Sequence, residues 1–167
     1  MDKRYLLMIV IIFVCFVNLY LIAVNSDVVG SATVEVGQYT CSIPHGFSLY
    51  DSDKNHAYLI DTNSKIIIHI YANLSDNSTY DNKVNEIINN SDYKLLSNGT
   101  INMGGIDIDS IYYREYDNNQ NRSTFYFTKE NETFRIIIMD FNYDADLNKT
   151  LDYVAVIVDS MKKDYRL

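Results

Sequence analysis

The chain has 167 residues, enough for one domain with an accessory segment. Its formal net charge of −8 argues against a nucleic-acid binder, which needs a basic face to meet phosphates. Two cysteines and one proline exclude a disulfide scaffold, a cysteine-rich zinc site and Pro/Gly-rich disorder.

The first predicted element is a transmembrane helix over residues 5–24, a stretch without any charged side chain. A helix of 20 residues is about 30 Å long, which matches the hydrocarbon layer of a bilayer. Lys3 and Arg4 precede it, and no basic residue follows until Lys54. Because positive charge stays on the cytoplasmic side, residues 25–167 are expected outside the cytoplasm.

The alternative for the amino end is a cleaved signal peptide, for which the small residues at 30–32 offer a cut site. The apolar stretch is longer than the core of about 7–15 residues that such peptides carry, which favours an uncleaved signal-anchor. The expected organisation is a cytoplasmic tail (1–4), a transmembrane helix (5–24), a linker (25–34) and an extracytoplasmic domain (35–167).

Hydrophobic periodicity predicts the elements of the outer domain. The run Ile66-Ile67-Ile68 with Ile70 is apolar on both faces, which suits a central strand covered on both sides. The expected elements, in chain order, are strands at 38–43, 58–61 and 65–71, a helix at 79–90 with Tyr80, Val84, Ile87 and Ile88 on one stripe, short strands at 93–97 and 100–103 around an Asn98-Gly99 turn, long strands at 106–116, 123–128 and 133–141, and a helix at 147–163.

The order of strands, helix, strands, helix indicates an α+β domain, with a mostly antiparallel sheet flanked by helices. The three long consecutive strands should form an antiparallel meander. The last helix should cover the sheet with its apolar stripe. The expected core combines Ile66, Ile68, Ile70, Ile136 and Ile138 of the sheet with Leu151, Val154, Val158 and Met161 of that helix.

The segment Ile43-Pro44-His45-Gly46-Phe47 resembles the opening I-P-x-G-F of PsbP-like domains, and the similarity extends over about residues 36–163. The resemblance implies an α/β/α sandwich and no shared set of catalytic residues, so no enzyme activity and no cofactor are expected. Together with the membrane anchor, the resemblance suggests an archaeal or bacterial surface protein. The anchor, the short linker, the sequons and the missing catalytic residues lead us to expect a non-catalytic domain that binds or supports another surface or envelope component; a calcium-dependent binding module is the alternative.

Asparagine is abundant, and seven asparagines are followed two places on by Ser or Thr. N-glycosylation of an exposed outer domain explains this pattern, and so does an Asn-rich composition with polar loops. The seven sequons begin at Asn73, Asn77, Asn89, Asn98, Asn121, Asn131 and Asn148.

Few residues suggest catalysis. The histidines, His45, His56 and His69, belong to different elements, and His69 is expected to be half-buried on a strand. Asp107 and Asp109 share one face of a strand, either as a solvent-facing polar stripe or as the paired carboxylates of a hydrolase.

Cys41 alternates with apolar residues and should be a small buried side chain, with an intermolecular disulfide as the alternative.

The segment 140–148 carries oxygen-bearing side chains at alternate positions, as calcium loops do. Ala145 replaces the usual glycine and Leu151 the usual bidentate glutamate, so the pattern also fits a loop whose polar residues cap the last helix. The candidate calcium ligands are Asp140, Asn142, Asp144 and Asp146, with Asn148 next in the alternation.

Overall fold

The computed structural model describes residues 32–74, 79–142 and 146–164, all of which fall in one compact unit that begins at Ala32. The expected transmembrane helix over residues 5–24 lies outside the described residues. No helix within the described ranges is long and apolar enough to span a membrane.

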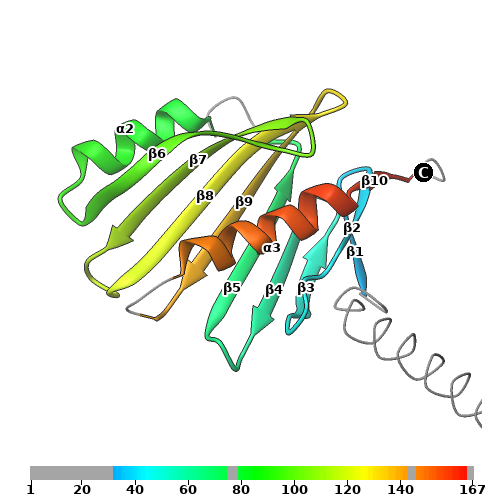
Figure 1. Ribbon diagram of the computed structural model, residues 1–167, viewed down its shortest axis with the longest axis horizontal. Helices are drawn as coiled ribbons and strands as arrows, with labels where there is room; N and C mark the ends of the chain where they lie inside the picture. Colours follow the sequence, from blue (N-terminus) through cyan, green and yellow to red (C-terminus); the bar gives the residue numbers. More distant parts are fainter. Residues whose placement is uncertain (1–31, 75–78, 143–145, 165–167) are drawn as a thin grey trace, which may run out of the picture. The chain divides into compact units, whose positions relative to one another are not determined.

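The described unit is an α+β domain built on a twisted antiparallel sheet (Figure 1). This sheet has the strand order β3-β4-β5-β9-β8-β7-β6, and a smaller sheet has the order β1-β2-β10. The elements are β1 (Thr33–Val36), β2 (Tyr39–Ser42), β3 (Ser48–Asp53), β4 (His56–Asp61), β5 (Ile66–Ala72), α2 (Tyr80–Asn89), β6 (Tyr93–Met103), β7 (Ile106–Glu115), β8 (Gln120–Lys129), β9 (Glu132–Asp140), α3 (Leu147–Ser160) and β10 (Lys162–Lys163).

The predicted antiparallel meander is confirmed: β7 pairs with β8, and β8 with β9. The early β4–β5 hairpin joins this meander through β9, where Ile68 lies opposite Ile138. β5 is therefore an interior strand, as its run of isoleucines indicated.

The prediction of two short strands around Asn98-Gly99 is wrong. β6 runs unbroken from Tyr93 to Met103 with one bulge, and pairs with β7 along nearly its whole length. The turn lies at Gly104-Gly105, where both residues have positive φ angles of 58° and 83°, as a two-residue hairpin requires. A turn at Asn98-Gly99 would have left part of the β7 edge that faces away from β8 without hydrogen bonds.

One face of the sheet is closed by α3, which crosses it as Figure 1 shows. Asp146 caps the helix by accepting hydrogen bonds from the backbone N–H groups of Asn148 and Lys149. Val154, Ile157 and Val158 of the helix are at most 1% exposed. The expected core is confirmed: the five isoleucines of β5 and β9 are at most 3% exposed, and Leu151 and Met161 pack with them.

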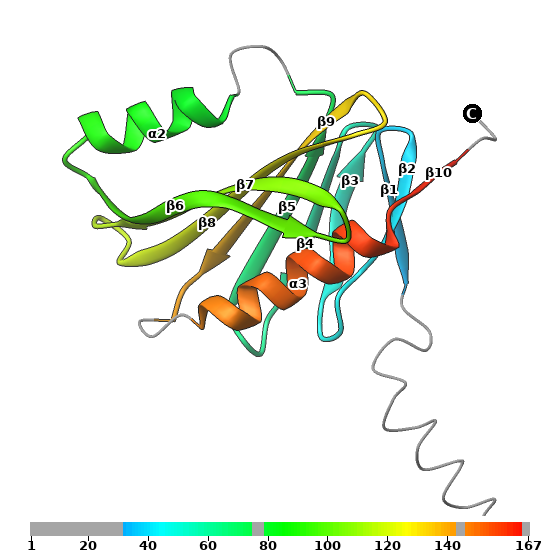
Figure 2. The same cartoon turned by 45° about the horizontal axis from the view of Figure 1, so that its top comes forward.

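The opposite face is covered only in part, by α2 (Figure 2). Thr79 caps this helix, and Ile87 packs against Ile111, Tyr113 and Tyr126 of the sheet. Ile88 is 63% exposed, so the prediction that it belongs to the buried stripe is wrong.

The alternate residues of β5 on this same face, Ile67, His69 and Tyr71, are only half-buried. The expectation of a strand fully covered on both sides is therefore wrong for this face.

Three short strands escaped prediction. β1 begins at Thr33, two residues before the expected start of the domain, and its alternating burial places Val34 and Val36 in the core. β3 is an exposed edge strand without an apolar face, and β10 has two residues. Cys41 is 1% exposed, which confirms it as a small buried side chain.

Candidate binding face

The part of the sheet that α2 leaves uncovered carries a cluster of rings and one arginine. We call this surface the open face. It consists of Tyr50 of β3, His56 and Tyr58 of β4, His69 and Tyr71 of β5, and Arg135 of β9. These side chains share a face because strand residues alternate between the two sides of a sheet.

The rings of the open face form a continuous series. Tyr50 lies 4.9 Å from Tyr58, and Tyr58 lies 4.6 Å from His69 between ring centroids. His56 lies 4.5 Å from Tyr71, at an interplanar angle of 20°. Tyr50 is 70% exposed and the other four rings are half-buried, so solvent reaches the series.

His56 and His69 contact one another directly, through His56 Nε2 and His69 Nδ1 at 2.9 Å. Burial of the ring, then the charge of His56, lowers the pKa of His69 to about 4. His69 is therefore neutral at physiological pH. The prediction that His69 is half-buried on a strand is confirmed, whereas its pairing with His56 was not foreseen. His45 is exposed in the loop after β2.

Arg135 lies at the edge of this series. Its guanidinium carbon is 4.7 Å from the centroid of the Tyr71 ring, a cation–π contact. On its other side, Arg135 pairs in register with Tyr126 of β8. Burial raises the pKa of the Tyr126 hydroxyl, and the neighbouring Arg135 charge opposes that rise.

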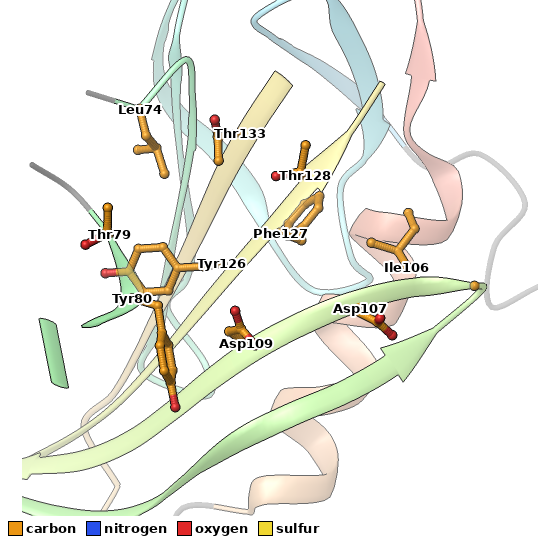
Figure 3. Close-up of a pocket in the computed structure, with 11 residues that line it drawn as sticks. Leu74, Thr79, Tyr80, Ile106, Asp107, Asp109, Tyr126, Phe127, Thr128 and Thr133 are labelled. Atoms are coloured by element: carbon orange, nitrogen blue, oxygen red, sulfur yellow. The ribbon is translucent and has the colours of Figure 1, made fainter. Parts of the chain in front are cut away.

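A pocket of about 560 Å³ opens beside α2 on the same side of the sheet (Figure 3). Tyr80 and Tyr126 meet edge to face there, with ring centroids 6.3 Å apart. Thr133, two residues before Arg135 on β9, also lines the pocket. The remaining lining residues are Leu74, Thr79, Gly105, Ile106, Asp107, Asp109, Phe127 and Thr128.

Asp107 and Asp109 do share one face of β7, and both line this pocket. Asp107 Oδ1 accepts a hydrogen bond of 2.7 Å from Asn102, and Asp109 Oδ1 accepts one of 2.6 Å from Thr100. Both donors lie on β6, so the carboxylates form cross-strand polar pairs at the pocket wall.

Two of the candidate calcium ligands, Asp140 and Asp146, accept hydrogen bonds from within the protein. Asp140 Oδ1 accepts hydrogen bonds from the backbone and the side chain of Asn142. Asp146 is the N-cap of α3, the capping role that was the alternative to calcium. Asp144 lies outside the described residues. In the described part of the chain, no group of three or more His, Cys, Asp or Glu side chains is placed to hold a metal ion.

Five of the seven sequon asparagines are exposed, and Asn77 lies outside the described residues. Asn121 is 8% exposed, its Oδ1 accepts from Arg114, and its Nδ2 donates to the carbonyl of Asn142. Because a glycan is attached through Nδ2, glycosylation of Asn121 would conflict with its contact to Asn142 and with its burial. The exposed asparagines are Asn73, Asn89, Asn98, Asn131 and Asn148.

The segment that resembles the PsbP-like opening has a structural role. Ile43 and Phe47 are buried, and the Phe47 ring meets Tyr153 of α3 edge to face at 5.0 Å. The motif thus fixes the chain between β2 and β3 against the last helix, at a distance from the rings of the open face.

No protein-family model matches the chain, and no curated protein is similar to it in sequence. Solved structures do resemble it. The solution structure of cyanobacterial PsbP from Synechocystis sp. PCC 6803 has a TM-score of 0.53 at 13% identity, over 81% of this chain and 94% of the cyanobacterial chain.

A crystal structure of a protein from Bacteroides thetaiotaomicron VPI-5482 has a TM-score of 0.52 at 8% identity, over 81% of this chain. This chain covers 49% of that longer protein, about half its length. At these identities the likeness concerns the fold alone. The described domain has a PsbP-like α+β fold.

Proposed function

We propose that the chain is a non-catalytic, membrane-tethered PsbP-like domain that binds another component of the cell surface or supports an envelope complex. Residues 5–24 provide the tether and residues 25–167 lie outside the cytoplasm. The observation that carries the proposal is the difference between the two sides of the sheet: α3 with β1 and β2 covers the apolar core on one side, and the other side leaves a series of rings open to solvent.

The composition of the open face supports a role in binding. Tyrosine and arginine are enriched at protein interfaces, because both combine a large contact area with hydrogen-bonding groups. The open face runs from Tyr50 through Tyr58 and His69 to Tyr71 and Arg135, and each neighbouring pair is 4.6–6.0 Å apart. Tyr58 stacks on His69 and His56 stacks on Tyr71 across adjacent strands, so these four rings have little side-chain entropy left to lose on binding.

Photo-crosslinking in living cells tests the proposal. A photoreactive amino acid replaces Tyr50 in the open face or, as the matched control, Tyr116, which is 54% exposed beside the β7–β8 turn. We expect a discrete crosslinked product from position 50 and none from position 116. Identical products from both positions, or no product from position 50, would contradict the proposal.

A second candidate function rests on the pocket. Asp107 and Asp109 line it together, so a hydrolase with paired carboxylates is the alternative. A panel of chromogenic glycosides, esters and phosphate esters separates the two functions. Turnover that Asp107→Asn and Asp109→Asn each abolish would establish the hydrolase, whereas the binding function predicts no turnover by the unmodified chain.

A further inference from the structure

Arg135 differs from other cations of the domain because it has no carboxylate partner within the residues that the structure describes. The formal charges comprise 22 acidic and 14 basic residues, so carboxylates outnumber possible partners. In the described part of the chain, Arg122 pairs with Glu115 at 2.5 Å and Lys83 with Glu86 at 2.6 Å. No described carboxylate lies within ion-pair distance of Arg135.

The Arg135 side chain is half-buried, and its Nε atom is buried without a hydrogen-bond partner. Stacking on Tyr71 and a hydrogen bond with the Tyr126 hydroxyl, not pairing with an acid, hold the guanidinium on the sheet. A cation that is partly withdrawn from water without a counter-charge costs stability. An anion delivered from solution would restore the missing charge partner.

The side chains around Arg135 include both polar groups and apolar surface. Its register partners are Tyr71 on β5 and Tyr126 on β8. Thr124, diagonally across on β8, is 1% exposed, and its hydroxyl has no hydrogen-bond partner. Ile137, two residues along β9, is half-buried on the same face. A ligand at Arg135 would therefore meet rings and an aliphatic side chain next to the charge.

We infer that Arg135 is the anchor of a binding site for a ligand that presents a single carboxylate on an apolar or aromatic body. The inference rests on the proposed function, because it assigns the chemistry that the open face recognises. The planar guanidinium binds a carboxylate through two parallel hydrogen bonds, and the body packs on Tyr71 and its neighbours.

The negative net charge of the chain favours singly charged anions over multiply charged ones as ligands of Arg135. A formal net charge of −8 repels polyanions and doubly charged phosphates more strongly than a monoanion. Small polar anions would also forgo the ring contacts. The site is accordingly matched to a monocarboxylate with an apolar body, whether this is a free acid or the carboxyl terminus of a peptide.

Titration of the full-length chain in detergent micelles, followed by NMR of the tyrosine ring signals, tests the inference. The probes are 3-phenylpropionate and N-acetylphenylalanine, which represent a free acid and a peptide carboxyl terminus. Their amides lack the charge, acetate lacks the body, and inorganic phosphate has a different charge and shape. We expect both acids to shift the ring signals of Tyr71 and Tyr126, and the amides, acetate and phosphate to leave them unchanged.

Variants assign the effect to one side chain. A hydrogen bond to a charged group contributes about 1.5–3 kcal/mol, so Arg135→Gln should weaken binding of the acids about 10- to 100-fold. Arg122→Gln is the matched control, because it removes an arginine of the same sheet that already has a carboxylate partner. It should change the affinity less than about twofold, a difference within the range of screened surface charges.

Equal binding by the unmodified chain and Arg135→Gln would overturn the inference, as would equal shifts from the acids and their amides. Phosphate binding in place of the acids would overturn the assigned ligand class. Unchanged tyrosine ring signals outside Tyr71 and Tyr126 in Arg135→Gln without ligand show that the variant is folded. If those signals collapse, Arg135→Lys replaces it in the test. This variant keeps the charge but loses the planar fork, so it should bind the acids with an affinity between those of the unmodified chain and Arg135→Gln.

This titration needs no cellular partner. If neither acid binds but position 50 still gives a crosslinked product, the carboxylate-binding inference is refuted and the proposed binding function stands. If the acids bind but position 50 gives no crosslinked product, the carboxylate site stands and the proposed binding to a surface component is refuted.

Discussion

His56 Nε2 and His69 Nδ1 lie 2.9 Å apart on adjacent strands, with ring planes at 11° and ring centroids 5.2 Å apart. The distance between the ring centroids equals the N–N distance plus about one ring radius for each imidazole. The two nitrogens therefore lie between the ring centres, and the imidazoles meet edge to edge, as an N–H···N hydrogen bond requires. A second proton would set two N–H donors against each other.

This pair predicts a loss of stability in acid. The pKa of His69 falls from 6.5 to about 4 in the folded chain, mainly through burial and then through the charge of His56. Between these values the unfolded chain binds more protons than the folded one, so the free energy of unfolding falls as the pH drops from 6.5 towards 4. Because the ring is half-exposed, we expect a loss on the order of 1 kcal/mol after discounting for solvent screening.

Urea unfolding of the full-length chain at pH 7 and pH 4.5 measures this loss. His69→Gln should reduce the difference between the two pH values, whereas His45→Gln, in an exposed loop, should not. An identical pH dependence in all three proteins would contradict the depressed pKa of His69.

The assignment of the two helices predicts unequal effects of one substitution. Ile157 of α3 is fully buried and Ile88 of α2 is 63% exposed. Ile157→Ala should destabilise the domain by about 2–5 kcal/mol through lost apolar contact and a cavity. Ile88→Ala should stay within about 0.5 kcal/mol of the unmodified chain. Equal changes in the urea midpoint would show that α3 is not the lid of the core.

Cys41 should be inert in the folded chain. It is 1% exposed, and burial raises the pKa of its thiol to about 12, which leaves almost no thiolate at neutral pH. Iodoacetamide should modify the peptide that contains Cys41 only after denaturation, as read by mass spectrometry. A disulfide-linked dimer through Cys41 would support the intermolecular alternative instead.

Calcium should leave the melting temperature unchanged. Binding to the folded state raises stability, but Asp140 and Asp146 already accept hydrogen bonds from Asn142 and from the first turn of α3. Asp146→Ala should instead cost about 1 kcal/mol through loss of the helix cap, with or without calcium. A calcium-dependent rise that Asp140→Asn abolishes would restore the calcium-binding function.

The elements that the sequence predicted well share a strong periodic signal. α3 repeats apolar residues at helical spacing, and the hairpin of β4 and β5 is marked by polar turn residues. The misses have physical causes. Asn98-Gly99 is a strong turn signal, yet pairing with the ten residues of β7 outweighs it. The all-exposed β3 has no apolar alternation to detect.

The open face was harder to predict because it depends on strand order. Once β4 and β5 are taken as a hairpin, their register brings His56 and His69 to diagonal positions, so this pair was within reach of the sequence. The surroundings of Arg135 could not be predicted in this way, because its neighbours come from β5 and β8, which lie far apart along the chain.

Covalent footprinting of tyrosines tests most directly the claim that the open face is the binding surface. The purified full-length chain and the chain in intact cells with a permeable outer envelope are exposed to the same hydroxyl-radical dose. Modification of Tyr50 and of Tyr116 is then compared by mass spectrometry, since these side chains are 70% and 54% exposed. We expect Tyr50 to be modified in the purified chain and protected in cells, and Tyr116 to be modified in both. Equal modification of Tyr50 in the two samples would contradict the claim.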